Sequence, residues 1–401
     1  MKELFNQVSA NETHPYWQNM LSRIHPIYKR PHDIRSDFER DYNRIIYCNA
    51  FRRLKHKTQV FFSPKNDHIC TRLEHVYNVE ATSYTIAKAL GLNTNLTRAI
   101  SIAHDIGHSP FGHQGEKILN QFAKEDFSES FWHERNGLTI VDDVELLEDT
   151  ENCKQNLNLT YAVRDGIISH CGEIDENGLK PRSNFIDLTS DYQIPNQYAP
   201  YTWEGCVVKI SDKIAYLGRD IKDAISTGIL DQNLNELYDL LEYPKSKKIN
   251  NANIISDLIY DVCVNSNLEN GLSFSEKTFQ TIQNLKDFNY KNIYRNPKLS
   301  PSIEYFSLIL SNIYQLLKNA YAGKETPKEL KKLEKYYPNL ILEFSDWISN
   351  YWDLNETREH LKNRILYHMD KKEDYYKAVI TYISGMTDSY AIQTYSEIIK
   401  F

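Results

Sequence analysis

The chain has 401 residues, of which 41% are hydrophobic and 25% charged, and its formal net charge at pH 7 is -7. This length allows two or three average domains, or one large helical domain with a lobe attached. The negative charge disfavours nonspecific nucleic-acid binding as the main activity, since surfaces that bind phosphate backbones are usually basic. The longest apolar runs are far shorter than a membrane span, residues 1–10 carry no signal-peptide-like apolar stretch, and the six cysteines form no CxxC pair. These features predict a soluble cytoplasmic protein with free thiols.

Apolar residues recur through the chain with a period near 3.6, while glycine and proline are scarce, which predicts an all-α fold without internal repeats. The clearest helix begins after Thr71, which forms a T-x-x-E capping box with Glu74, and Gly91 is placed to end it. The residues expected on its core-facing stripe are Leu73, Val76, Ser83, Ile86, Ala87 and Leu90.

Three further helices follow in chain order. One is expected over about 95–107, with Pro110 enforcing the break after it, and the next starts near Gly112. A longer helix is expected over about 204–224, where Asp212 belongs to a polar stripe apart from the apolar stripe that faces the core. These helices carry most of the residues whose side chains could catalyse a reaction or bind a metal.

The domain organisation is predicted from where these patterns stop. Residues 228–300 are rich in Asn, Asp, Lys and Tyr and show no clear period, whereas helical periodicity returns from about 302 to the C-terminus. We expect an N-terminal segment at 1–34, a helical catalytic core at 35–230, and a helical C-terminal lobe at 231–401 that completes the pocket and the subunit contacts.

The strongest chemical signal lies in TRLEHVYNVE at 71–80 and AHDIGHSPFGHQGE at 103–116. His104 and Asp105 are neighbours in sequence, so both can face one point only where a helix ends, and His75 on the preceding helix can join them if the two helices pack antiparallel. Imidazole and carboxylate ligands together suit Mn, Fe, Mg, Co or Zn rather than a thiolate-selecting metal.

An ordinary explanation competes with a metal site. A single helical histidine is usually a hydrogen-bonded core or surface residue, and a His-Asp dipeptide occurs by chance in many proteins. The crowding of three histidines, an aspartate and a glutamate into fourteen positions favours the metal site, because crowded histidines usually bind metal or transfer protons.

Further segments, in the same order along the chain, resemble those of the HD-superfamily dNTP triphosphohydrolases, which include bacterial dGTPases and the SAM- and HD-domain dNTPases. The short HD pattern alone would indicate only the superfamily, whereas the ordered set is specific to the triphosphohydrolase branch. The matching segments are FERDYNRIIYCNAFRRLKHKTQVF at 38–61, FWHERNGLTIV at 131–141, NLTYAVRDGIISH at 158–170, WEGCVVKISDKIAY at 203–216, LKDFNYKNIYRNP at 285–297 and YISGMTDSYAIQ at 382–393.

The resemblance implies a divalent metal held by the H…HD…D pattern. Asp212 could not be chosen from spacing alone, because it is one of several residues on its polar stripe. The implied cation is Mn2+ or Mg2+, with Fe, Co or Zn also compatible with the ligands. The residues that match the ligands are His75, His104, Asp105 and Asp212.

The resemblance also implies residues for proton transfer and substrate binding. His113 and Glu116 match a proton-transfer pair, although Glu116 also fits an ordinary carboxylate in the first turn of a helix, and His133 matches a further histidine near the phosphates. Arg53 and Lys57 are weaker candidates, because a basic stretch in a helix is usually a solvated face. The matches to triphosphate contacts are His108, Arg72, Lys213 and Tyr216, and those near the deoxyribose 3′-hydroxyl are Gln59 and Asp220.

The implied activity is hydrolysis of dGTP or several dNTPs into deoxynucleoside and inorganic triphosphate, by water attack on the α-phosphate. The 5′-alkoxide is a poor leaving group and needs a general acid, for which His113 is the natural donor. Two other functions stay open: an HD enzyme acting on nucleoside monophosphates, cyclic nucleotides or alarmones, and a non-catalytic sensor of nucleotides or single-stranded nucleic acid.

The resemblance further implies partners. Related proteins form homo-oligomers, tetramers or hexamers, and are often activated by a dNTP at a second site, whereas nucleic acid is not indicated and no membrane is expected. Residues 230–280 match only loosely, and Ser389 stands where related sequences often have Arg, so the preferred base is left open.

Overall fold

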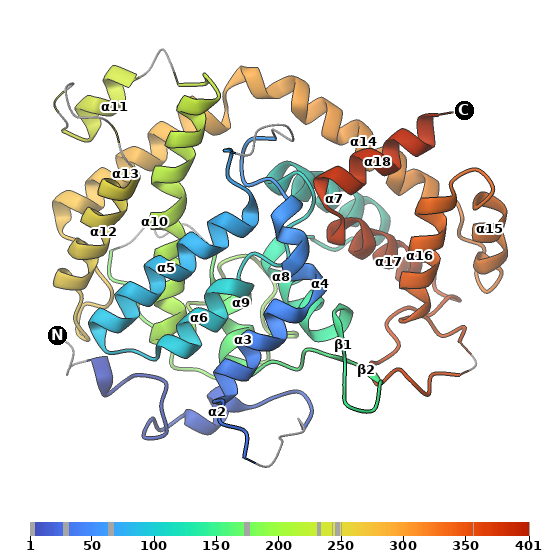
Figure 1. Cartoon of the computed structure of the whole chain (residues 1–401), viewed down its shortest axis with the longest axis horizontal. Helices are drawn as coiled ribbons and strands as arrows, with labels where there is room; N and C mark the ends of the chain where they lie inside the picture. The colour runs from blue at the N-terminus through green and yellow to red at the C-terminus, as the bar shows by residue number, and fades with distance from the viewer. Residues whose placement is uncertain are drawn as a thin grey trace. The chain divides into compact units, whose positions relative to one another are not determined.

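The computed structural model describes residues 5–26, 32–62, 68–171, 177–230, 234–242, 244, 249, 251–355 and 357–400. In these residues the only named strands form a two-stranded antiparallel sheet, β1 (Leu146–Glu148) with β2 (Lys154–Asn156), and helices make up most of the rest (Figure 1). The all-α prediction is confirmed.

The chain divides into two compact units, and each is assembled from three separate segments. The first unit comprises 1–46, 65–105 and 158–300, and the second comprises 47–64, 106–157 and 301–401. The expected catalytic core at 35–230 therefore contributes to both units, and the sequential division into a core and a lobe stays a prediction. Parts of the expected N-terminal segment (1–4 and 27–31) and of the expected lobe (231–233, 243, 245–248, 250, 356 and 401) lie outside the described residues.

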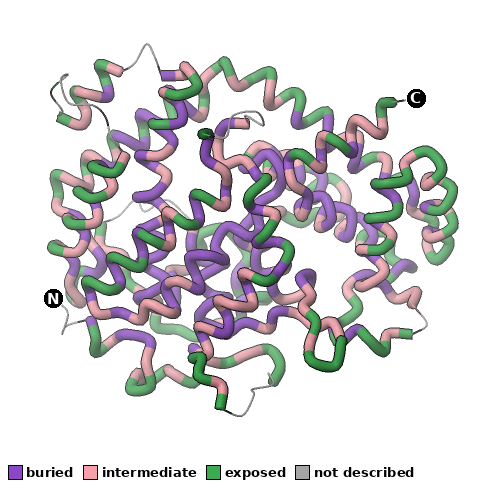
Figure 2. The backbone as a smooth tube through the Cα atoms, viewed as in Figure 1, coloured by how far each residue is buried: buried purple, intermediate pink, exposed green. Residues whose placement is uncertain are grey.

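The first unit is organised around one long buried helix, α10 (Trp203–Ser226), which packs against at least six other helices of the unit. Its expected apolar stripe is confirmed, since Val207, Ile210, Ile214, Leu217 and Ile221 are all buried (Figure 2). The other elements of this unit are α2 (Trp17–Leu21), α3 (Asp37–Tyr47), α5 (Arg72–Leu90), α6 (Thr94–Ala103), α9 (Tyr161–Ser169), α11 (Leu234–Leu240), α12 (Asn251–Asn265), α13 (Glu276–Asn289) and the short helices η3 (Tyr290–Tyr294) and η4 (Pro297–Leu299).

Helix α5 has the ends that the sequence predicts. Thr71 and Glu74 form the capping box, and Gly91 ends the helix in the left-handed conformation with φ of 83°. The expected stripe is buried except for Leu73, which is partly exposed. Ser83, the small polar member of the stripe, bonds through Oγ to Ser101 Oγ of α6 at 2.7 Å. This hydroxyl pair joins α5 to α6 without a buried unsatisfied group.

Helix α6 ends earlier than predicted. It stops at Ala103, and residues 104–107 form turns, so the expectation of a helix reaching Gly107 is wrong. The reason is the side chain of His104, whose Nδ1 lies 2.6 Å from the carbonyl oxygen of Ser101 and satisfies an acceptor of the last turn. The helix therefore ends directly before His104, one of the predicted metal ligands.

Helix α9 lies close to α6 because residue 166 has no side chain. A Cβ at Gly166 would lie 2.5 Å from Cγ2 of Ile100, closer than real contacts allow. The N-terminus of α9 is fixed by Asp41, whose carboxylate accepts bonds from the backbone N–H and the hydroxyl of Thr160 at 2.8 and 2.7 Å. Asp41 in turn binds Arg23 at 2.6 Å.

The second unit packs its helices around an apolar cluster that joins Leu119 and Phe122 to residues from 306–391. Residues 350–355 and 357–371 of this unit are not helical, so the expectation of helical structure from about 302 to the C-terminus is only partly right. Besides the sheet, its elements are α4 (Asn49–Arg53), η1 (Leu54–His56), α7 (Gly112–Phe127), α8 (His133–Thr139), the π-helix η2 (Ile140–Val144), α14 (Ser300–Lys318), α15 (Thr326–Leu333), α16 (Pro338–Ser349), α17 (Lys372–Gly385) and α18 (Asp388–Ile399).

Two further expectations concern the whole chain. The six cysteines are free thiols, as predicted. Among the described helices, none has both the length and the apolar character needed to cross a membrane.

The contact between α9 and α6 gives a stability prediction. Gly166→Ala should lower the free energy of unfolding by about 1–3 kcal/mol, because the added methyl overpacks the interface with Ile100. Unfolding in urea, followed by circular dichroism, measures the change. Gly385→Ala is the matched control, since its nearest contact would be Arg53 Nη2 at an ordinary 3.8 Å. If Gly166→Ala and wild type had the same free energy of unfolding, the interface between α9 and α6 would accommodate the added methyl group without losing stability.

Candidate active site

In the first unit, the four predicted metal ligands converge from three helices. His75 lies in the first turn of α5, His104 and Asp105 follow the end of α6, and Asp212 lies midway along α10. His75, His104 and Asp212 place one ligand atom each within 4.8 Å of one another. The sequence prediction that these side chains share a site agrees with this geometry.

The distances inside this group leave room for a cation. Nε2 of His104 is buried without a hydrogen-bond partner, and it lies 3.6 Å from Oδ1 of Asp105 and 3.9 Å from Oδ1 of Asp212. These separations are too long for hydrogen bonds. They suit donor atoms that each approach one ion at about 2.0–2.2 Å. The residues present therefore fit a divalent metal.

His75 and Asp212 form the one short contact among the four ligands, with His75 Nε2 2.9 Å from Asp212 Oδ1. Burial opposes the charged form of both groups, but their hydrogen bond and mutual charge prevail, so the pKa of His75 is raised and that of Asp212 is lowered. The same negative potential that holds a proton here also favours a cation.

Arg72, predicted as a triphosphate contact, is buried and bonds through Nη1 to Oδ2 of Asp105 at 2.7 Å. This contact fixes the carboxylate and leaves its other oxygen, Oδ1, toward the imidazoles of His104 and His170. A role of Arg72 in binding phosphate stays a prediction.

The polar face of α10 continues beyond Asp212 with Tyr216 and Asp220, each one turn further along. Asp220 is buried and accepts a hydrogen bond from Oη of Tyr294 at 2.6 Å. Burial raises the pKa of this carboxyl to about 7, although the bond from Tyr294 opposes the shift. A neutral Asp220 can both donate and accept a hydrogen bond, as a contact with a hydroxyl group requires. Lys213 is buried on the same helix.

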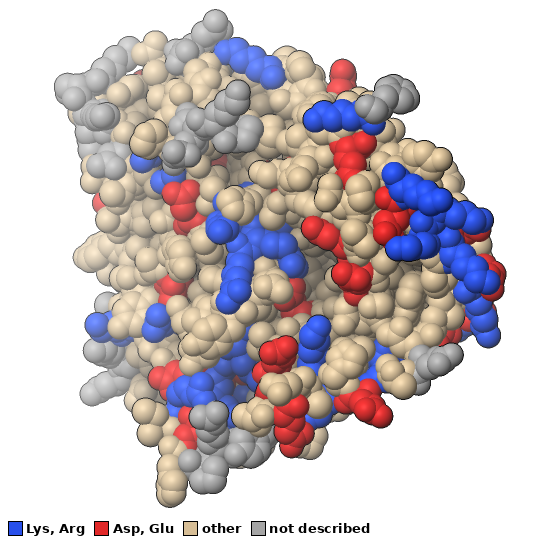
Figure 3. All heavy atoms as spheres, turned by 45° about the vertical axis from the view of Figure 1, so that its right-hand side comes forward, with Lys and Arg blue, Asp and Glu red and all other residues tan. Residues whose placement is uncertain are grey.

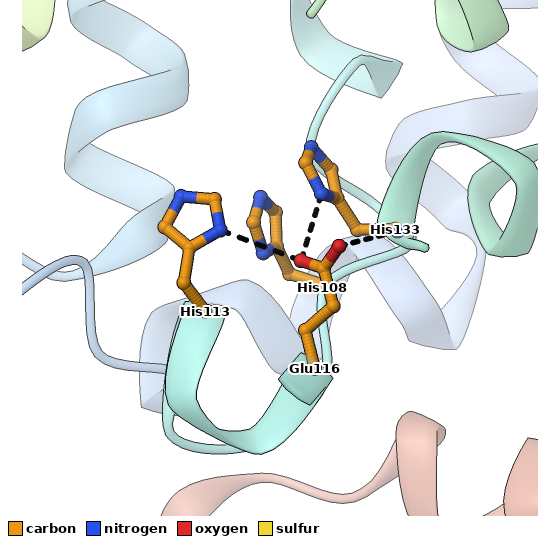
Figure 4. Close-up of side chains that lie close together, drawn as sticks. All are labelled: His108, His113, Glu116 and His133. Atoms are coloured by element: carbon orange, nitrogen blue, oxygen red, sulfur yellow. Dashed lines mark hydrogen bonds and ion pairs between the residues drawn. The ribbon is translucent and has the colours of Figure 1, made fainter. Parts of the chain in front are cut away.

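The second unit holds a cluster of three imidazoles and one carboxylate, formed by His108, His113, Glu116 and His133. Oε2 of Glu116 lies 3.0 Å from Nδ1 of His133 and 3.4 Å from Nδ1 of His113 (Figure 4). The rings of His108 and His133 stack with centroids 3.8 Å apart. In Figure 4 the other ring nitrogens of His113 and His133 lie on the side away from the carboxylate.

Glu116 is ionised in this arrangement. Burial alone would favour the neutral acid, but the neighbouring His133 and His113 hold its pKa well below the usual range. A carboxylate accepts hydrogen bonds only, so the proton lies on Nδ1 of each imidazole that it contacts. His113 is largely exposed and His133 is buried, which makes the two rings different in access to solvent.

Gly107 explains how His133 can lie against the loop that carries His108. A Cβ at Gly107 would lie 2.0 Å from the carbonyl oxygen of His133 and 2.2 Å from the backbone nitrogen of Gly137. The start of α8 therefore touches the backbone of this loop directly. Asn136 strengthens the contact by donating to the carbonyl of Gly107 at 2.7 Å.

Lys57, predicted as a weak substrate contact, is buried and donates to the carbonyl oxygens of His108 and Ser384. Asp388 has a related function: its two carboxylate oxygens accept from the backbone N–H of Phe111 at 2.8 Å and of Thr58 at 2.9 Å. These bonds brace the loop before α7, where Phe111 has a left-handed backbone with φ of 61°. They favour a positioning role for Lys57, and substrate contact stays a prediction.

Arg53 and Gln59 complete the predicted set. Nη2 of Arg53 binds Oε1 of Glu145 at 2.7 Å, and its side chain lines a cavity of about 190 Å³ beside Trp347 and Tyr382. Gln59 follows Thr58 and is partly exposed. For both residues, contact with a substrate stays a prediction.

Three residues of the two sites are not among the site residues predicted from the sequence: His170, Tyr294 and Asp388. Each lies in a segment that carries the family resemblance, but none was singled out. His170 could have been found from its position at the end of an apolar helix, the same signal that marks His104. Tyr294 and Asp388 act through contacts distant in sequence, which no local pattern reveals.

Comparisons with known proteins show the family of the chain. Two family models match the chain, an HD domain at residues 72–217 and a phosphohydrolase-associated domain at residues 349–397. A deoxyguanosinetriphosphate triphosphohydrolase-like protein from Caldanaerobacter subterraneus subsp. tengcongensis is 34% identical over 91% of this chain and 86% of the relative. The chain belongs to this family. A relative of the same name from Desulfatibacillum aliphaticivorans is 37% identical over 72% of this chain and 75% of the relative. Another, from Clostridium tetani, is 31% identical over 91% of this chain and 86% of the relative.

The matched HD domain contains all four predicted metal ligands, and the phosphohydrolase-associated match contains Asp388. Among solved structures, a hypothetical protein from Aquifex aeolicus is similar with a TM-score of 0.38 and 17% identity, over 68% of this chain and 58% of that chain. The chain thus spans little more than half of that protein.

Removal of the HD-domain aspartate tests the metal centre. Asp105→Ala should abolish metal retention, because it deletes a carboxylate ligand and leaves Arg72 buried without its partner, at a cost of about 3–5 kcal/mol in stability. Metal content after gel filtration measures retention, and circular dichroism reports folding. Asp220→Asn on α10 is the control and should keep its metal.

A second variant separates ligand loss from unfolding. Arg72→Met combined with Asp105→Asn removes both buried charges and should fold without metal. A folded Asp105→Ala protein that retains metal would exclude Asp105 from the centre.

The raised pKa of Asp220 predicts a pH-dependent stability. An unfolded aspartate titrates near 3.9, so between about pH 4 and 7 the folded chain binds this proton more tightly, and stability falls as pH rises through that window. Wild type loses this stability as pH rises, whereas Asp220→Asn does not. The free energy of unfolding of the variant minus that of wild type should therefore increase by on the order of 2–4 kcal/mol from pH 4 to pH 8. Urea titrations at several pH values measure the difference. Asp257→Asn, on the exposed face of α12, should show no such gain.

Proposed function

We propose that this protein hydrolyses dNTPs to the deoxynucleoside and inorganic triphosphate. The observation that carries the proposal is the convergence of His75, His104, Asp105 and Asp212 in a buried centre that fits a divalent cation. The names of the family relatives add the substrate class, since they are called deoxyguanosinetriphosphate triphosphohydrolase-like. We leave open whether dGTP or several dNTPs are substrates.

A divalent cation in the first unit, Mn2+ or Mg2+, with Fe, Co or Zn as further candidates, would supply Lewis acidity and positive charge toward phosphate oxygens. The protein adds cationic and hydrogen-bonding side chains to this centre. Lys213 and Tyr216 follow Asp212 on α10, and Arg72 is bonded to Asp105. Such donors offset the negative charge of a triphosphate, which must happen before water can approach phosphorus.

The reaction breaks one bond and forms one bond at the α-phosphorus. The oxygen of water binds phosphorus, the bond to the 5′-oxygen breaks, and the 5′-oxygen takes up a proton to give the deoxynucleoside. The triphosphate leaves with the oxygen of water. Protonation of the 5′-oxygen is the step that needs a protein acid, because an alkoxide is a poor leaving group.

We assign this acid to His113, with Glu116 as its partner. The carboxylate of Glu116 is ionised and contacts Nδ1 of His113, so it stabilises the imidazolium and orients the ring. His113 is exposed enough to meet a substrate, whereas His133 is buried and holds Glu116 more closely. His133 and His108 are proposed as groups that contact the phosphates, and Gln59 and Asp220 as contacts near the 3′-hydroxyl.

The formal net charge of -7 favours a nucleotide over nucleic acid as the partner. On the face drawn in Figure 3, Lys and Arg gather in a few places, and Asp and Glu lie beside them. On α15, for example, Lys331 pairs with Glu334 at 2.7 Å and Lys332 with Glu329 at 2.7 Å. Assembly into a homo-oligomer and activation by a second dNTP remain proposals that rest on the family resemblance.

The acid assignment predicts a kinetic effect. His113→Ala should slow turnover by about 10²–10⁴-fold with metal content unchanged, because it removes the proton donor and no ligand of the first-unit centre. Steady-state kinetics with metal analysis of the same sample measure both. His360→Ala, an exposed histidine elsewhere in the second unit, should behave as wild type. Loss of metal from His113→Ala would make His113 a ligand.

Product analysis tests the proposed reaction directly. The protein is incubated with each dNTP, and with mixtures, in Mn2+ or Mg2+, and the products are separated by chromatography. Deoxynucleoside with intact triphosphate supports the proposal, and activity only in mixtures indicates an activating dNTP. Mono- or diphosphate products would indicate another phosphohydrolase, and binding without turnover would indicate a nucleotide sensor.

A further inference from the structure

His170 is a buried histidine of the first unit that the proposed function leaves unused. It caps the C-terminal end of α9 and is 2% exposed. Its ring meets that of His104 edge to face, with centroids 4.9 Å apart. With His104 and Asp105 it forms a second group, in which one ligand atom of each residue lies within 4.8 Å of the others.

The same local structure orients His170 and His104. Each ring follows the last residue of a helix, and each Nδ1 lies near the carbonyl oxygen three residues earlier, at 2.7 Å from Ile167 for His170 and at 2.6 Å from Ser101 for His104. A carbonyl only accepts hydrogen bonds, so Nδ1 carries the proton in both rings and Nε2 carries a lone pair. The protein thus presents two imidazoles in the tautomer that binds metal through Nε2.

Both Nε2 atoms lie near the same carboxylate oxygen. Oδ1 of Asp105 lies 3.6 Å from Nε2 of His104 and 3.9 Å from Nε2 of His170. The separations exceed a hydrogen bond and match donors that share one ion.

The backbone around His170 holds this position. Gly166 lets α9 approach α6, and Asp41 anchors the opposite end of the helix through Thr160. His170 therefore reaches the centre on an element that is fixed at both ends.

We propose that His170 is a further protein ligand of the divalent cation, in addition to His75, His104, Asp105 and Asp212. The inference rests on the proposed function only for the presence of a cation. Three imidazoles and two carboxylates favour Mn, Fe, Co or Zn over Mg2+, which prefers oxygen ligands and retains water.

The first experiment counts imidazoles at the metal. The full-length protein is loaded with one equivalent of Cu2+, and pulsed electron paramagnetic resonance counts the imidazoles coupled to it. We expect three in wild type and two in His170→Ala. His360→Ala, which removes an exposed histidine outside both histidine groups, is the control and should leave the count at three. A count of two in wild type overturns the inference, even if His170→Ala does not fold.

The second experiment measures affinity. His170→Ala should bind Mn2+ about 10- to 100-fold more weakly than wild type, with an unchanged melting temperature of the metal-free protein. Weaker binding together with a lower metal-free melting temperature, and an unchanged imidazole count, would make His170 a packing residue and overturn the inference. Wild-type protein that binds no cation would overturn the proposed function as well, whereas two imidazoles with intact dNTP hydrolysis would overturn only this inference.

Discussion

A guanidinium as deeply buried as that of Arg72 is tolerated in a protein interior only with a carboxylate at hydrogen-bond distance, and Asp105 provides it at 2.7 Å. Arg72 is the first residue of α5, and Asp105 lies two residues beyond the end of α6, so this one pair ties the entry of one helix to the exit of the other. It also determines which oxygen of Asp105 faces His104 and His170. Much of the geometry of the first-unit centre therefore depends on one buried ion pair.

Helix ends supply most of the chemistry in both units. His104 and His170 lie just after the ends of α6 and α9, and His133 is the first residue of α8. At a helix end, backbone groups lack partners within the helix, so a side chain can bond to one of them and become fixed in orientation. The carbonyl oxygens of Ser101 and Ile167 accept hydrogen bonds from two imidazoles and so fix their orientation. Glu116 fixes a third imidazole, because it contacts both the ring and the backbone N–H of His133.

Features of the fold that depend on neighbouring residues can be predicted from the sequence. Features that depend on contacts between residues distant in sequence cannot. The capping box of Thr71 and the apolar stripe of α10 follow from neighbouring residues, which a sequence displays directly. The end of α6 was placed too late because the bond from His104 to Ser101 competes with the helix, and the pattern of apolar residues does not record it. The partnership of Asp220 with Tyr294 spans 74 positions, and that of Asp388 with Phe111 spans 277, so only the folded chain reveals them.

The alternation of the two units along the chain affects how the protein emerges from the ribosome. The chain passes from one unit to the other five times, once directly after Asp105, and the first unit has all its segments once residue 300 is made. Helices α7 and α8 are synthesised early, but the apolar partners of Leu119 and Phe122 on α14 and α17 come from the final hundred residues. Helix α7 ends at residue 127 and α14 ends at residue 318. At about 5–20 residues per second, these surfaces would stay unpaired for about 10–40 s, which makes the nascent protein a candidate client for chaperones.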